Sequence, residues 1–335
     1  MRHALVTGAT GFIGHHLIQR LLAQGTTVKC LVRSQSRSAD LSRLDVTLVQ
    51  GDLADVSSLA AAVKDVDVVY HLAGLTKSVS TRDLMRVNGE GTQNVAIACS
   101  QCKCPPTLVL VSSLAAAGPA ADAEPRVETD AVNPVSNYGH SKRAGELAVI
   151  DLADEVPITI VRPPIVFGEH DRDVLHWFKM IRKLGIHLTP GLQDYHCSVI
   201  HADDLVSVLI VAAEQGERVT RGTEDDKGIY FAACDELMTY SEIGRLIGDC
   251  VGRPSTRVVH VPMFMIWGLA LSCDFWARLR SHSTILNLDK AREAAAGGWA
   301  CSSAKLRRQT GFVPAMGLRE RLGQTADWYI RQSWL

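Results

Sequence analysis

The feature that most constrains the fold of this chain is a glycine-rich turn between an apolar strand and a helix. Residues 4–7 form a short apolar run, Gly8, Gly11 and Gly14 follow it, and apolar residues then recur with helical period over 17–22. Glycines let backbone N–H groups and a helix N-terminus approach a pyrophosphate, where the helix dipole favours negative charge. The turn therefore predicts a dinucleotide site directly after the first strand.

Short apolar runs and longer segments of helical period alternate through the first half of the chain. The predicted strands are 4–7, 28–32, 46–50, 68–72, 108–112 and 158–162. The predicted helices include 13–23, 84–99 and 141–152. Strands that alternate with helices in this way are typical of an α/β fold with a doubly wound parallel sheet.

Strands become sparse after residue 165, where glycine, proline and charged residues interrupt the helical segments. We therefore expect a dinucleotide-binding Rossmann domain over 1–165 and a smaller, mostly helical substrate-binding domain over 166–335. Two later segments, 198–213 and 229–232, have patterns that would let them rejoin the first domain.

Composition excludes several classes of partner. The 335 residues carry 35 basic and 36 acidic side chains, so the net charge of −1 provides no field that would attract nucleic acid. The apolar stretch 261–273 is shorter than the about 18 residues that a transmembrane helix needs. The nine cysteines show no pairing pattern, and Cys99, Cys102 and Cys104 lack a fourth zinc ligand. We expect a cytoplasmic protein with no nucleic-acid partner, no transmembrane span and no metal.

Residues 7–14 read TGATGFIG, which resembles the hallmark of the extended short-chain dehydrogenase/reductases, also called the NAD-dependent epimerase/dehydratase family. Further segments that resemble the family are 51–53, 71–74, 87–94, 112–113, 138–142, 162–168 and 201–204. They follow in the family's order over roughly the first 200 residues. The stretch 262–269 resembles the branch of 3β-hydroxysteroid dehydrogenases and dihydroflavonol reductases. The resemblance implies a Rossmann fold and an NAD(P)-dependent oxidoreductase.

The resemblance also implies which residues contact the cofactor. They are Gly8, Thr10, Gly11, Phe12, Ile13, Gly14, Asp52, Leu53, Leu72, Ala73, Gly74, Tyr138, Lys142, Pro163 and Ile165. The end of the second predicted strand adds Arg33, Ser34 and Arg37 and carries no carboxylate. An acidic residue there holds the ribose 2′-OH of NAD, whereas an arginine accommodates the 2′-phosphate of NADP. We therefore expect NADP(H), with NAD as the alternative.

The candidate catalytic residues are Ser113, Tyr138 and Lys142. Tyr138 and Lys142 are four residues apart, so they project from one face of a helix. A lysine ammonium one turn away stabilises a phenolate, which brings a tyrosine with a pKa near 10 into range as an acid/base. The resemblance assigns Tyr138 as the acid/base, Lys142 as its partner and ribose ligand, and Ser113 as the donor to the substrate oxygen. Ser112 is the alternative serine.

The second half carries the evidence on substrate. Sugar-nucleotide members of the family have an arginine that pairs with the substrate pyrophosphate, and Cys197 occupies that position here. Ala117 stands where the epimerases often have tyrosine. The apolar stretch 261–276 is expected to be core, with an entrance for an apolar substrate as an alternative, and Arg278 and Arg280 beyond it leave a weak peripheral membrane contact open.

We therefore expect a reductase or dehydrogenase that transfers hydride between NADP(H) and a small apolar ketone or secondary alcohol, acting as a homodimer. A nucleotide-sugar epimerase or dehydratase is one alternative. A non-catalytic NADP-binding scaffold is another, although such a protein has no need of the Ser113, Tyr138 and Lys142 relay.

Several polar residues are expected to be structural. His15 and His16 follow the glycine turn and have the positions of packing or surface residues. Asp203 and Asp204 precede an apolar helix, which favours a capping role over a metal site with His201. Asn88 is expected to hold loops near the active site.

Overall fold

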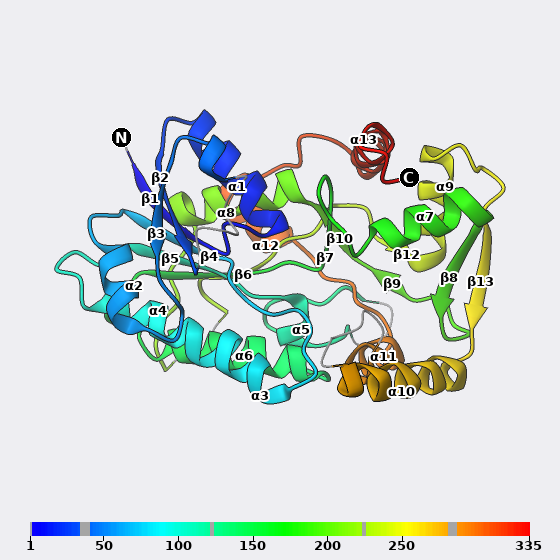
Figure 1. The fold of residues 1–335 in the computed structure, drawn as a ribbon, viewed down its shortest axis with the longest axis horizontal. Helices are drawn as coiled ribbons and strands as arrows, with labels where there is room; N and C mark the ends of the chain where they lie inside the picture. The colour runs from blue at the N-terminus through cyan, green and yellow to red at the C-terminus, as the bar shows by residue number, and fades with distance from the viewer. Residues whose placement is uncertain (1, 34–40, 121–123, 223–225, 281–286) are drawn as a thin grey trace.

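A computed structural model describes residues 2–33, 41–120, 124–222, 226–280 and 287–335, with only the backbone described at 275 and 277–280. Its centre is a parallel sheet of seven strands (Figure 1). In spatial order the strands are β3 (Val46–Gln50), β2 (Thr27–Val32), β1 (His3–Thr7), β4 (Val68–His71), β5 (Thr107–Val111), β6 (Ile158–Arg162) and β11 (Ile229–Phe231). The chain order reverses between β1 and β4, which is where doubly wound sheets bind dinucleotides. The α/β prediction is confirmed.

Helices cover both faces of this sheet (Figure 1). On one face lie α1 (Phe12–Ala23), α8 (Ala202–Gln215) and α12 (Ala304–Thr310). On the other lie α2 (Val56–Val63), α4 (Gly91–Ser100) and α6 (Asn137–Ile150). Because both faces are covered, strands such as β6 are buried along their whole length. This packing explains why the strands read as nearly continuous apolar runs.

The second half forms a layer beside the sheet and also returns to it. The strand β11 pairs in parallel with β6, with Ile229 opposite Ile160. The remaining strands are β7 (Ile165–Phe167), β8 (Ile186–Pro190), β9 (His196–Cys197), β10 (Val199–His201), β12 (Met238–Thr239) and β13 (Arg257–Val261). The remaining helices are α3 (Thr81–Leu84), α5 (Leu114–Ala117), α7 (Leu175–Leu184), α9 (Tyr240–Cys250), α10 (Met263–Arg280), α11 (Leu288–Ala295) and α13 (Leu318–Arg331). A domain boundary near residue 165 remains our proposal.

The predicted helix over 84–99 is interrupted. The chain forms α3, then a π-helix over Met85–Glu90, and then α4. The wider turn carries Asn88, which is buried and binds the chain after β4: its Nδ2 donates to Leu75 O at 2.8 Å, and its Oδ1 accepts from Leu75 N at 2.8 Å. A π-turn is typical of functional sites, and periodicity alone does not reveal it.

The expectation that 261–276 is core is wrong. This stretch forms most of α10 at the edge of the molecule (Figure 1). Phe264 is 75% exposed, and Met265, Leu269 and Leu271 are each more than half exposed, whereas Ala270 is buried. An apolar composition all round a helix predicted burial, but α10 packs along one side only.

Candidate active site

The glycine turn has the backbone geometry of a phosphate loop. Gly8 has a φ of +73°, and a Cβ built there would lie 2.7 Å from the backbone nitrogen of Ala73. A Cβ on Gly14 would overlap the carbonyl oxygen of Gly8. Gly11 is the N-cap of α1, and no side chain caps the helix there. The first turn therefore keeps backbone donors for an anion, and these residues fit a dinucleotide pyrophosphate.

Other predicted cofactor residues lie along the carboxyl ends of neighbouring strands. Arg33 is exposed directly after β2, whereas Ser34 and Arg37 lie outside the described residues. Asp52 and Leu53 follow β3, and Leu72, Ala73 and Gly74 follow β4. Pro163 and Ile165 lie at the end of β6 and the start of β7. The predicted cofactor residues within the described part of the chain therefore lie at one edge of the sheet.

His71 fixes the strand end beside the glycine turn. It is buried, with Nδ1 2.7 Å from Thr7 Oγ1 and Nε2 3.0 Å from Thr92 Oγ1. Burial, with a smaller contribution from Lys142, lowers the pKa of His71 to about 3. The neutral ring therefore acts as a fixed hydrogen-bonding strut between β1, β4 and α4.

Ser113 and Tyr138 meet at the predicted catalytic centre. Ser113 follows β5 and is the N-cap of α5, where its hydroxyl accepts from Ala115 N at 3.1 Å. Tyr138 is in the first turn of α6, and its phenol lies close enough to Ser113 for the serine hydroxyl to act on the pKa of the phenol. Burial raises the pKa of Tyr138, while Ser113 and Lys290 oppose the rise. The phenol therefore holds its proton at neutral pH.

Lys142 lies one turn further along α6 and is buried. Its Nζ donates to the carbonyl oxygen of Val111 at 2.7 Å and lies next to Gly74. Burial lowers the pKa of Lys142 to about 8, against the opposing charge of Glu146. This arrangement anchors the ammonium at the end of β5, close to the chain that follows β4.

Ser112, the alternative to Ser113, belongs to a buried structural network. Its hydroxyl donates to Glu146 Oε1 at 2.5 Å. Arg162 donates to the same carboxylate through two nitrogens, at 2.8 and 2.7 Å. Burial disfavours the charge on Glu146, but Arg162 and Ser112 outweigh it and hold the pKa of the carboxyl below its usual value. Ser113 is therefore the serine whose hydroxyl meets Tyr138.

The helix α11 supplies site residues that sequence reasoning missed. Asp289 accepts from the backbone nitrogens of Asn137 and Tyr138, at 2.7 and 2.9 Å. Ser136 donates to Glu293 at 2.7 Å, and the Lys290 ammonium lies 5.7 Å from the centre of the Tyr138 ring. These contacts fix the N-terminus of α6 and place a second cation beside Tyr138. A separation of about 150 residues hid them, since no local pattern links the two segments.

A cavity of about 90 Å³ lies beside this contact. Residues of the chain after β4, the start of α6, α10 and α11 line it, among them Lys77, Asn137, Asp274 and Lys290. Sites for small organic ligands occupy about 300 Å³ or more. A substrate that enters here must therefore displace part of this wall.

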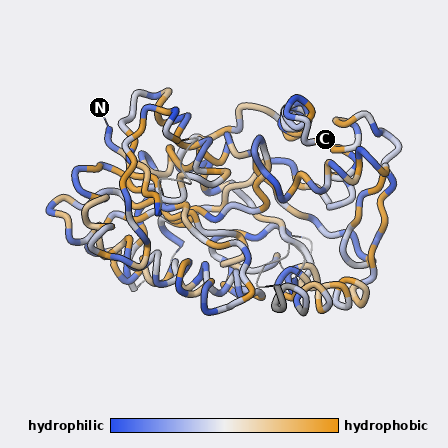
Figure 2. Tube along the Cα trace, in the orientation of Figure 1, coloured by the Kyte–Doolittle hydropathy of each residue, from blue (hydrophilic) through white to orange (hydrophobic). Residues whose placement is uncertain are grey.

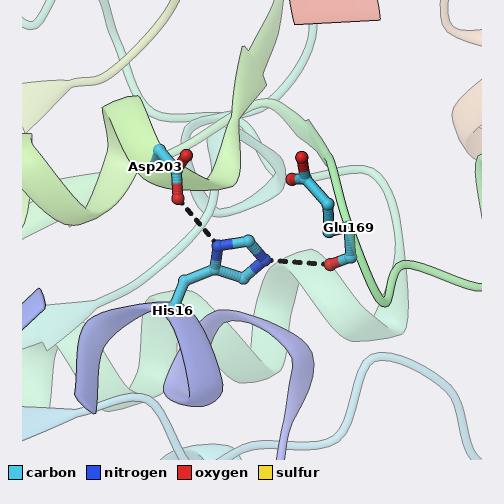
Figure 3. A group of neighbouring side chains, drawn as sticks. All are labelled: His16, Glu169 and Asp203. Atoms are coloured by element: carbon cyan, nitrogen blue, oxygen red, sulfur yellow. Dashed lines mark hydrogen bonds and ion pairs between the residues drawn. The ribbon is translucent and has the colours of Figure 1, made fainter. Parts of the chain in front are cut away.

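His16 is at the centre of a polar cluster behind the glycine turn (Figure 3). Its Nδ1 lies 2.8 Å from Asp203 Oδ1, and its Nε2 lies 2.9 Å from the carbonyl oxygen of Glu169. Both partners can only accept, so both ring nitrogens donate and the ring is an imidazolium. The described residues contain one group with spacing suited to a metal ion, formed by His16, Glu169 and Asp203. His16 cannot bind a metal in this state, because both of its ring nitrogens carry a proton.

The predicted capping role of Asp203 and Asp204 is wrong. The cap of α8 is His201, whose Nδ1 accepts from Asp203 N at 3.2 Å. Asp204 instead pairs with Arg321 of α13 through bonds of 2.9 and 2.6 Å, and Asp203 pairs with His16. The sequence around residues 203 and 204 predicted a helix cap, because it does not reveal partners as distant as His16 and Arg321.

The imidazolium predicts a pH dependence of stability. Burial lowers the pKa of His16, but Asp203 and Glu169 outweigh it and raise that pKa above 6.5. Because its pKa is raised, His16 makes its full contribution to the free energy of unfolding below pH 6.5. That contribution is lost as the pH rises through the raised pKa. We expect His16→Gln to lower the free energy of unfolding by about 1.5–3 kcal/mol at low pH and by less at high pH.

Urea denaturation at several pH values would measure this difference. The control is His15→Gln, since His15 is the half-buried histidine next in the chain and one of its ring nitrogens lies 3.0 Å from Nε2 of Gln19, one turn away. If the loss of unfolding free energy in His16→Gln stays constant from acid to alkaline pH, His16 is not an imidazolium in the folded protein.

Comparison with known proteins identifies the family of this chain. The NAD dependent epimerase/dehydratase family matches residues 4–224. A ceramide reductase from Caulobacter vibrioides is 30% identical, over 98% of this chain and 95% of its own length. A 2-alkyl-3-oxoalkanoate reductase from Shewanella oneidensis is 29% identical, over 83% of this chain and 73% of its own.

Solved structures show the same fold. The UDP-glucose 4-epimerase of Thermotoga maritima, solved with UDP-glucose, superposes with a TM-score of 0.77 over 99% of both chains, at 18% identity. At this identity the likeness concerns the fold alone. With the family match over most of the chain, it leads to one conclusion: the protein belongs to the NAD-dependent epimerase/dehydratase family and is an NAD(P)-dependent enzyme of the extended short-chain dehydrogenase/reductase type.

Proposed function

We propose that this enzyme uses NADP(H) to reduce the carbonyl group of a hydrophobic, lipid-like ketone, or to oxidise the matching secondary alcohol. The observation that carries the proposal is the proximity of Ser113 to the phenol of Tyr138, at the edge of the sheet where the glycine turn also lies. Such a pair can bind a substrate oxygen and exchange a proton with it.

In this proposal each residue has one task. A bound nicotinamide supplies the hydride for reduction and accepts it in oxidation. Ser113 donates a hydrogen bond to the substrate oxygen, and Tyr138 gives that oxygen its proton. The phenol of Tyr138 has a raised pKa, so it carries the proton that reduction requires at neutral pH. Lys142 holds the cofactor ribose and supplies positive charge near the nicotinamide.

The exposed Arg33 supports a preference for NADPH, because a guanidinium at the end of β2 can pair with a 2′-phosphate.

We expect NADPH to bind more tightly than NADH. Arg33→Ala should narrow that gap by about tenfold to a hundredfold, the range of a hydrogen bond to a charged group. Fluorescence titrations would measure both affinities, with Arg20→Ala as a control on the exposed side of α1. Added salt should weaken the preference; equal affinities in the wild type would overturn the role of Arg33.

The burial of Cys197 and the names of two relatives support an apolar substrate. Cys197 is buried, and burial raises the pKa of its thiol, so it offers no charge to a substrate pyrophosphate. Two reductases among the relatives are named for ceramide and for 2-alkyl-3-oxoalkanoates. We propose the same substrate class for this chain.

Calorimetry tests the substrate class. The enzyme with saturating NADP(H) is titrated with long-chain ketones, their secondary alcohols, UDP-sugars and dTDP-sugars. We expect binding of the ketones or alcohols only. Micromolar binding of a sugar nucleotide, with silent ketones, would favour the epimerase alternative. Cofactor binding without any ligand or turnover would favour the scaffold alternative.

A further inference from the structure

The outer side of α10 exposes a continuous apolar surface. Phe264, Met265, Leu269, Leu271 and Trp276 are each more than half exposed. Residues 265 and 269 are four apart, and 264 and 271, like 269 and 276, are seven apart, so the five residues lie on one broad side of the helix. We call these five residues the α10 face. Figure 2 shows the hydrophobic segments along this helix.

The exposed positions of this face carry no charge where the structure describes side chains. Between residues 263 and 276, two further described residues are exposed, Gly268 and Ser272, and neither is charged. Asp274 is the one charged residue of this stretch, and it is half-buried. A helix that faces water normally carries charged residues on that side. Arg278 and Arg280, which bear on a membrane contact, lie among the side chains that are not described.

The apolar surface continues beyond the helix. Leu192 is 77% exposed, and its neighbour Gly191 lies against Met263 at the start of α10. In the adjoining pair of strands, Leu188 is directly opposite Val259, and both side chains are exposed. The elements that carry these residues lie together at one corner of the molecule (Figure 1).

We propose that the α10 face docks on the surface of a lipid bilayer, from which the enzyme takes its substrate. This proposal rests on the lipid-like substrate class proposed above. No helix in the described part of the chain combines the length and apolarity needed to cross a bilayer, so the contact is peripheral. An apolar helix side without charge can lie in the region between headgroups and acyl chains.

The shape of the surface favours a bilayer over a second copy of the chain. A stable dimer buries about 800 Å² on each partner, usually over a broad patch. The α10 face is one side of one helix that projects at the edge of the molecule (Figure 1). A single exposed helix side offers only one narrow strip to a second copy, whereas acyl chains adapt to any shape it has.

The packed side of α10 leads to the catalytic centre. Asp274 lines the 90 Å³ cavity together with Asn137, the residue before Tyr138. The next helix, α11, binds the backbone of Tyr138 through Asp289. Docking through the α10 face would therefore place the wall of the cavity near the bilayer, which shortens the path of a lipid ketone to Ser113 and Tyr138.

Flotation with phosphatidylcholine vesicles tests the docking. We expect the wild type to float with vesicles, with little effect of salt because the contact is apolar. The double variant Phe264→Glu, Leu269→Glu should lose vesicle affinity by about tenfold or more, since both side chains must enter the bilayer. The control is Val313→Glu, an equally exposed apolar residue outside this surface, which should float like the wild type.

Turnover separates this inference from the proposed function. The double variant should reduce a short, water-soluble ketone at the wild-type rate, but reduce a long-chain ketone embedded in vesicles more slowly. Absence of vesicle binding by a wild type that turns over ketones would overturn the docking alone. Vesicle binding without turnover of either ketone would overturn the proposed function alone. If sedimentation shows a dimer that the double variant dissociates, and vesicles do not bind, the face joins two copies and the inference is wrong.

Discussion

Replacing Tyr138 with phenylalanine should reduce kcat by about 100- to 10,000-fold, the usual contribution of a positioned acid/base. Only the hydroxyl that meets Ser113 is removed, so the glycine turn and its helix remain intact. NADPH should therefore bind within a few fold of its wild-type affinity. A turnover assay beside a fluorescence titration with NADPH would measure both effects.

Tyr195→Phe is the matched control, since Tyr195 is half-buried beside Gly297 and outside the proposed relay. It should leave turnover unchanged. Near-normal turnover by Tyr138→Phe would remove this residue from the proposed mechanism. A large loss of NADPH affinity would instead mean that the tyrosine acts mainly in binding.

The second large effect concerns stability. Glu146 and Arg162 are both buried, and Glu146→Gln would leave the Arg162 guanidinium without a countercharge. Removal of one partner from a buried ion pair costs about 3–5 kcal/mol. We expect that loss in urea denaturation at neutral pH. Arg143→Gln, which removes a more exposed partner of the same carboxylate, should cost less than about 1 kcal/mol.

The sign of the pH dependence provides an independent check. The pKa of Glu146 is lowered in the folded protein, so its contribution is complete above the unfolded value of 4.5 and is lost as the pH falls through the lowered value. The deficit of Glu146→Gln should therefore be constant at neutral pH and shrink only in acid. A deficit below 1 kcal/mol at neutral pH would contradict the buried pair.

Local patterns in the sequence predicted the sheet well. The glycine turn, the apolar strands and the Tyr138-Lys142 spacing each depend on residues close together in the chain, and the fold confirms the strand positions within one residue at each end. The helix that bears Tyr138 begins earlier than predicted, at Asn137, because Ser136 caps it and Asp289 binds its first backbone donors.

Two of the features that were missed depend on distant partners. Asp289 reaches Tyr138, and His16 reaches Asp203, across more than 150 residues in each case. The exposure of α10 was missed for a different reason. An apolar helix has the same composition whether it lies in a core or on a surface that binds a membrane or a partner, so packing alone decides between these roles.

The central claim is hydride transfer between NADPH and a hydrophobic ketone. It is tested most directly with NADPH that carries deuterium at the nicotinamide C4 position, incubated with the enzyme and a long-chain ketone. Mass spectrometry should find one deuterium on the carbinol carbon of the product, in step with oxidation of the cofactor. A ketone recovered without deuterium, together with epimerised or dehydrated sugar nucleotide and no net cofactor oxidation, would contradict the claim.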